Sequence, residues 1–253
     1  MLTWLKNLMR PAELISAEQQ QWLEQGMAQF NRVMALHQFS PRLITPTIKD
    51  FPSKADSPEG IALATLQQIK QYMGLEQQSF TIKAPNQFDV SLPAHLLQPM
   101  VLNQKQNALS QPVYIDYHPA HLNNPNALVS VMAIQLSHWL LQPSELDAIG
   151  GEQMRPQAAE LLSIALGAGI MVANSAFTFR GGGCGSCHNT KLGRKAMLSE
   201  AETCYAIALF CQSHDLDYKK ALPHLKPHLR SMVKMANKQL TKKAATHFKA
   251  ITQ

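Results

Sequence analysis

Three short runs decide the fold class of this chain: Ser79–Lys83 (SFTIK), Phe88–Leu92 (FDVSL) and Pro112–Asp116 (PVYID). Apolar and polar residues alternate along them, which predicts half-buried strands. Helical patterns lie on both sides of these runs. The sequence therefore predicts an α+β fold, in which a small sheet in the N-terminal half packs with a mainly helical C-terminal half.

Two helices are expected before the sheet. The first begins at Ser16, because Ser16–Gln19 (SAEQ) matches a capping box, and it ends near His37. The second begins at Ser57–Glu59 (SPE) and stops at Gly74. The proline-rich loop between them predicts an irregular connection.

The chain after residue 123 is expected to be helical. Start signals and apolar spacing predict four helices there, at Asn124 to about Leu141, from Pro156, from Ser199–Glu202 (SEAE) and at about 219–240. Neither a repeat nor a Gly/Ser linker divides the sequence. We therefore expect one domain over 1–253, with helices and the sheet in 1–123, a helical region in 124–240 and a cysteine-containing loop at 181–198.

Composition restricts the class of protein. Of the 253 residues, 45% are hydrophobic and 16% are charged, which excludes a disordered chain. Four cysteines are too few for a disulfide framework in a chain of this length, and Lys6 and Arg10 interrupt the apolar N-terminus. We therefore expect a cytoplasmic protein. The apolar stretch 158–179 contains polar residues and glycines, so it predicts a buried helix and no transmembrane segment.

Positive charge is concentrated at the C-terminal end. From Lys191 onward there are 12 Lys and Arg against 4 Asp and Glu. This excess invites a nucleic-acid interpretation. The region lacks interleaved aromatic residues, however, and Lys234, Lys238 and Lys242 have the four-residue spacing of one helix face. We therefore expect a solvated helix face and disfavour nucleic acid as a partner.

The stretch Val131–Leu141 (VMAIQLSHWLL) carries the first chemical signal. In the H-E-x-x-H helix of zinc peptidases, two histidines four residues apart bind the metal and the glutamate activates water. Only the second histidine is present here, as His138. Ile134 has no lone pair for a metal, and the neutral amide of Gln135 cannot act as a general base.

The order of motifs resembles a group of uncharacterised bacterial zincin-like proteins over about residues 43–230. The matching stretches are Thr45–Pro52 (TPTIKDFP), Tyr72–Gly74 (YMG), the Asn124–Pro125 turn, the helix around His138, Glu160–Leu162 (ELL), Gly167–Phe177 (GAGIMVANSAF) and Leu198–Glu202 (LSEAE). The resemblance implies a zincin-like fold for the helical half.

The resemblance also implies roles for single residues. His138 matches the second metal histidine and Glu160 the third ligand, whereas Ile134 and Gln135 replace the first histidine and the catalytic glutamate. The implied protein is a zincin-like pseudoenzyme without peptidase activity, which acts by binding an unknown protein or small molecule. An active hydrolase would need substitutes for both Ile134 and Gln135.

Each of these residues also has a purely structural interpretation. His138 beside Trp139 can be a packed histidine, and a carboxylate at Glu160, in the first turn after Pro156, is favoured by the helix dipole. His118 and His121 could supply a replacement ligand if their loop folds back.

A second candidate site is the C-x-x-C-H string formed by Cys184, Cys187 and His188. The string matches the haem c attachment motif and also half of a zinc site. A redox pair and two reduced thiols without a ligand are the other interpretations. Cys204 and Cys211 have the spacing of core residues. The sequence thus predicts either no cofactor or a zinc ion, and it disfavours haem. A metal-binding or haem-binding module remains the alternative function.

Overall fold

The computed structural model describes residues 13–52, 55–83, 113–141, 149–177 and 194–251. Three sequence predictions lie outside these residues. They are the strand at 88–92, the site formed by Cys184, Cys187 and His188, and the N-terminal stretch that contains Lys6 and Arg10.

The N-terminal half contains two helices and a small parallel sheet. Helix α2 (Ala17–Leu36) begins with the predicted capping box at Ser16, and α3 (Pro58–Tyr72) begins after Ser57, whose side chain accepts a hydrogen bond from the Gly60 N–H. Strands β1 (Phe80–Lys83) and β2 (Val113–Asp116) pair in parallel. Both helices and these two strands are confirmed.

The central part of the chain is buried helix. A 3-10 turn, η3 (Pro119–Asn123), leads into α4 (Pro125–Leu140), which Asn124 caps. A second 3-10 turn, Glu152–Met154, leads into α5 (Arg155–Ser163), which is joined through a π-helical turn (Ile164–Ala168) to α6 (Gly169–Ser175), with a kink at Gly167. The prediction of helices from Asn124 and near Pro156 is confirmed.

The C-terminal part differs from the prediction in two places. A two-residue parallel pair, β3 (Ala176–Phe177) with β4 (Arg194–Lys195), precedes α7 (Glu200–Ser213). The last helix, α8, spans Pro227–Ile251 and not 219–240. Two 3-10 turns occupy Tyr218–Lys220 and Leu222–His224, because prolines at 223 and 227 prevent a continuous helix there.

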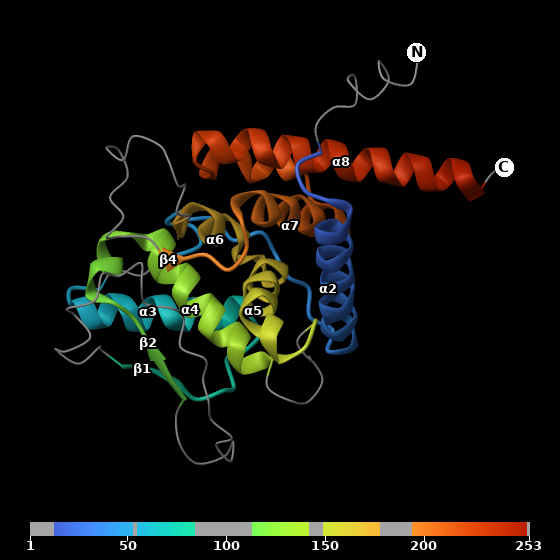
Figure 1. Ribbon diagram of the computed structural model, residues 1–253. Helices are drawn as coiled ribbons and strands as arrows, with labels where there is room; N and C mark the ends of the chain where they lie inside the picture. The colour runs from blue at the N-terminus through green and yellow to red at the C-terminus, as the bar shows by residue number, and fades with distance from the viewer. Residues whose placement is uncertain (1–12, 53–54, 84–112, 142–148, 178–193, 252–253) are drawn as a thin grey trace.

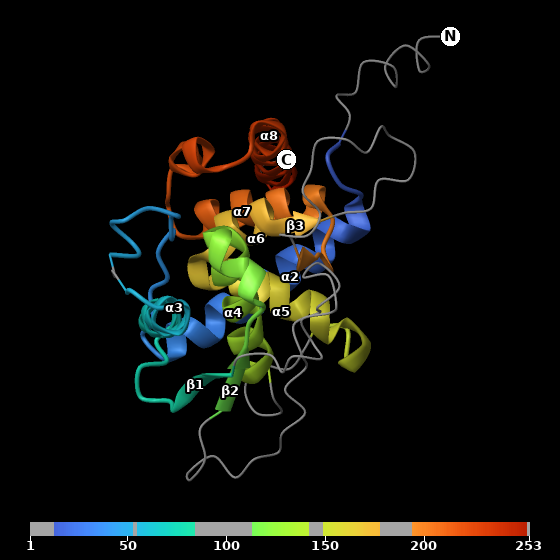
Figure 2. The same cartoon turned by 90° about the vertical axis from the view of Figure 1, so that its left-hand side faces the viewer.

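The elements surround one hydrophobic core. Helix α8 lies along α7 at one edge of the molecule, and β1 and β2 lie at the opposite edge beside α3 and α4 (Figure 1). Turning the view shows α4, α5 and α6 between these edges (Figure 2). Buried apolar residues from Ile15 to Leu240 form a single cluster. The α+β class with a sheet in the N-terminal half is thus confirmed.

The run Glu152–Ser175 is long and apolar enough to cross a membrane, but its most apolar window is completely buried inside the protein. The π-helical turn bends this run at Gly167. The prediction that the stretch 158–179 is buried and helical is therefore confirmed as far as Ser175, although it forms two helices joined at a kink and Ala176–Phe177 belong to β3.

Candidate functional site

Gln135, which the resemblance matches to a catalytic glutamate, binds the backbone of the sheet. Its Oε1 accepts a hydrogen bond from the Asp116 N–H at 2.9 Å, and its Nε2 donates to the Asp116 carbonyl at 2.6 Å. The side chain is 1% exposed. One side-chain amide thus satisfies both backbone polar groups of Asp116, the last residue of β2. A carboxylate could not do this, because it has no hydrogen to donate.

Ile134 and His138 lie on the same buried helix. Ile134, which the resemblance matches to a first metal histidine, is an apolar side chain completely buried in the core. His138 is 3% exposed, and its Nδ1 has no hydrogen-bond partner within the described chain. Burial and then the positive charge of Arg155 lower its pKa to about 4. The nearby guanidinium would repel a metal cation at this position.

Glu160 is buried and uses both carboxylate oxygens on the backbone. Oε1 accepts from the Met197 N–H and Oε2 from the Leu198 N–H, each at 2.9 Å. Glu160 is the sixth residue of α5, so the interpretation that places it in the first helical turn is wrong. Its carboxylate instead fixes the segment that leads to α7, since a buried carboxylate needs donors of this kind.

No described part of the chain brings three His, Cys, Asp or Glu side chains close enough to hold a metal ion. His118 and His121 therefore do not complete a three-residue site with His138. They lie next to each other in the turn before α4, with ring centroids 5.8 Å apart.

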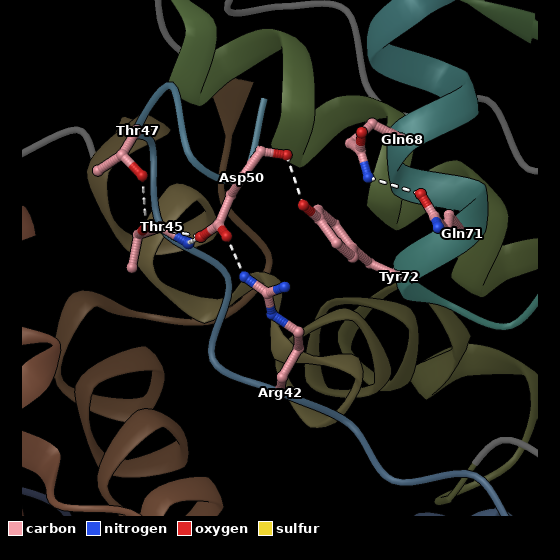
Figure 3. Close-up of polar contacts among 7 residues, drawn as sticks. All are labelled: Arg42, Thr45, Thr47, Asp50, Gln68, Gln71 and Tyr72. Atoms are coloured by element: carbon pink, nitrogen blue, oxygen red, sulfur yellow. Dashed lines mark hydrogen bonds and ion pairs between the residues drawn. The ribbon is translucent and has the colours of Figure 1, made fainter. Parts of the chain in front are cut away.

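The Thr45–Pro52 motif forms a hydrogen-bonded loop around the buried Asp50 carboxylate (Figure 3). Thr45 donates to it from both its backbone N–H and its hydroxyl, and Arg42 forms an ion pair with it. Burial acts to raise the pKa of Asp50, but the hydrogen bonds from Thr45 and the charge of Arg42 lower it below its usual value. Tyr72, from the Tyr72–Gly74 motif, donates to the Asp50 carbonyl.

The Gly167–Phe177 motif is also used for packing. Gly167 has φ +98°, and a Cβ there would lie 1.9 Å from the carbonyl oxygen of Arg42. The Gly167 carbonyl accepts a hydrogen bond from the Ile44 N–H. Asn174 donates to the His224 carbonyl and accepts from the Lys226 N–H. These contacts connect the Thr45–Pro52 loop and the start of α8 to the central helices.

Cys204 and Cys211 are buried in α7, as their spacing predicts. Burial and then the charge of Glu200 raise the pKa of Cys204 to about 12, and burial and then Asp217 raise that of Cys211 to about 11. Both thiols are therefore protonated at neutral pH and are poor metal ligands.

Asp116 is a residue that sequence reasoning missed, because its contact with Gln135 uses the backbone and not the side chain. Met197 was missed for the same reason.

Comparison with protein-family models finds no match, and comparisons with curated proteins and with solved structures likewise find none. The zincin-like resemblance therefore remains an expectation from the motifs.

Proposed function

We propose that this chain is a zincin-like pseudoenzyme, without peptidase activity, which acts in the cytoplasm by binding a protein or small molecule. One observation carries the proposal. The side chain at the catalytic position, Gln135, binds both the backbone N–H and the backbone carbonyl of Asp116, so it is committed to holding the sheet against α4.

Two further contacts support the loss of a zinc site. Ile134 belongs to the hydrophobic core, and both oxygens of Glu160 accept backbone hydrogen bonds. A metal ion would have to compete with these two N–H groups for Glu160. It would also be repelled by Arg155, whose charge acts on His138.

The partner is proposed to be a protein or small molecule and not a nucleic acid. Lys234, Lys238 and Lys242 are all exposed along α8, as a solvated helix face requires. Proteins usually bind single-stranded nucleic acid by stacking its bases on exposed aromatic rings. Within the part of α8 whose side chains are described, this lysine face presents no exposed Phe, Tyr or Trp ring.

The test compares the chain with variants that return the lost chemistry. With zinc added, the purified chain is expected to hydrolyse neither casein nor mixed peptides. The Ile134→His, Arg155→Gln variant returns one ligand, removes the repelling charge and keeps the Gln135 contact, so it is expected to gain one equivalent of zinc by elemental analysis. Adding His138→Ala should remove that zinc, whereas the distant His228→Ala should not.

Two results would overturn the proposal. Zinc-dependent hydrolysis by the unchanged chain would show that it is an enzyme. If the Ile134→His, Arg155→Gln variant is folded by circular dichroism and still binds no zinc, the zincin-like origin of the site is ruled out. The Ile134→His, Gln135→Glu variant then asks whether hydrolysis returns.

The alternative is a metal-binding or haem-binding module that uses Cys184, Cys187 and His188. The C-x-x-C-H string favours it, although neither Cys204 nor Cys211 offers a thiolate to complete the site. Absorption spectroscopy and elemental analysis of reduced protein distinguish the two functions. The module would be favoured if bound zinc disappears in the Cys184→Ser, Cys187→Ser variant. A haem Soret band would favour it as well.

A further inference from the structure

The turn between β2 and α4 contains two histidines with unsatisfied ring nitrogens. His118 is 8% exposed and His121 is 1% exposed, and their rings are tilted by 57°. In the described chain, Nε2 of His118 and both ring nitrogens of His121 have no hydrogen-bond partner. Three such atoms on two neighbouring side chains are unusual, because each buried polar atom without a partner costs about 1–3 kcal/mol.

Both rings are neutral at physiological pH. Burial lowers the pKa of His118, and burial together with the neighbouring His118 lowers that of His121 to about 4. A neutral imidazole has one nitrogen lone pair that is free to bind a metal.

The turn holds the two rings in place. Pro119 restricts the backbone, and the His121 N–H donates to the His118 carbonyl at 2.8 Å. The Gln135 contact fixes Asp116 two residues before His118, and the Asn124 cap fixes the start of α4 after His121. The pair is therefore held at both ends by hydrogen bonds.

We propose that His118 and His121 together bind one transition-metal ion, copper(I), between their rings. Imidazole nitrogen is a good ligand for copper, and copper(I) accepts two ligands in a near-linear arrangement. A coordination number of two suits this turn, because the described residues supply no third His, Cys, Asp or Glu ligand. This site is separate from the one on which the proposed function rests.

The spacing of the rings fits such an ion. A metal lies about 2 Å from a histidine nitrogen and so about 3 Å from the ring centre, which allows two rings on one metal to be up to about 6 Å apart. The observed separation of 5.8 Å is just within that limit.

Binding requires one proton to move within His118. Its Nδ1 accepts a hydrogen bond from the Ala120 N–H at 3.1 Å, which places the ring proton on Nε2. When Nε2 binds the metal, this proton moves to Nδ1, so the Ala120 contact is lost and the Nδ1–H and the Ala120 N–H both need new acceptors, at a cost of about 1–3 kcal/mol each that metal binding must exceed. His121 has no contact to lose.

The test uses the full chain with Cys184→Ser and Cys187→Ser, so that these thiols do not bind the metal. Copper(I) is titrated anaerobically in competition with a chromophoric chelator. One equivalent is expected to bind, and His121→Leu should weaken that binding at least tenfold, whereas the exposed His228→Ala should leave it unchanged. His118→Gln gives a second, more conservative variant if His121→Leu does not fold.

The same titration with zinc separates two kinds of metal site. Zinc is expected to bind more weakly than copper(I). Tighter binding of zinc would overturn the two-coordinate assignment, because zinc requires about four ligands. The site itself would be overturned if the folded parent does not bind copper(I). It would also be overturned if His121→Leu binds copper(I) as tightly as the parent does.

Discussion

Two polar regions of the protein, one around Gln135 and Glu160 and one in the turn of His118 and His121, differ in how their buried groups are satisfied. Around Gln135 and Glu160, every carboxylate or amide oxygen accepts a hydrogen bond from a backbone N–H. In the turn of His118 and His121, three buried nitrogens have no partner in the described chain. The side chains of Gln135 and Glu160 therefore have internal partners without a ligand, whereas three ring nitrogens of the His118 and His121 turn do not.

This difference separates residues that hold the fold from residues that are available to a ligand. A buried polar group with internal partners stabilises the protein, and one without them destabilises it. A substitution should therefore cost much stability in the first region and little in the second. Four measurements test this comparison.

The largest effect is expected from Glu160→Ala. It leaves the Met197 and Leu198 N–H groups buried without an acceptor and should lower the free energy of unfolding by about 3–5 kcal/mol. Urea unfolding followed by circular dichroism measures the change. The exposed Glu152 on the preceding turn gives the control, since Glu152→Ala should leave the unfolding midpoint nearly unchanged. Equal effects of the two variants would contradict the role of Glu160.

Gln135→Glu should have the next largest effect. The carboxylate cannot donate to the Asp116 carbonyl and brings a charge into a site that is 1% exposed, so a loss of about 2–4 kcal/mol is expected. Gln67 on α3 is exposed, and Gln67→Glu is the matched control for the same chemical change. A stable Gln135→Glu variant would mean that the amide is not needed to hold β2.

Acid should destabilise the protein through its buried histidines. The pKa values of His121 and His138 are about 4 in the folded state and about 6.5 in the unfolded state. Both residues are neutral in both states above pH 6.5. As the pH falls from 6.5 to 4, the unfolded state binds protons first, so stability falls by up to about 1.4 kcal/mol per pH unit for each histidine.

Thermal unfolding measured across this pH range checks the expectation. His121→Leu removes one of the two groups and should reduce the slope of stability against pH. An unchanged slope would show that His121 is not a neutral buried histidine.

The smallest effect is expected from His121→Leu in metal-free protein at pH 7.5. Since no internal hydrogen bond is lost, the free energy of unfolding should change by less than about 1 kcal/mol or increase. His118→Leu loses the Ala120 contact and serves for comparison. A loss above 2 kcal/mol in His121→Leu would place this residue among those that hold the fold.

The sequence predicted the elements better than the contacts between them. Capping residues such as Ser16 and Ser199 gave correct helix starts, because a cap bonds to residues only three positions away. The pair β3 and β4 was missed, since two residues carry no periodicity. The roles of Gln135 and Glu160 could not be predicted, because their partners are backbone groups 19 and 37 positions away.

The contact of Gly167 with Arg42 and Ile44 has a consequence for the order of folding. It joins segments that are more than 120 positions apart, and it requires the positive φ of the π-helical turn. The segment around Ile44 can therefore dock only after the central helices have formed, and closing so long a loop is slow. In pulse-labelling hydrogen exchange during refolding, the Ile44 amide should become protected later than the amides of α5 and α6.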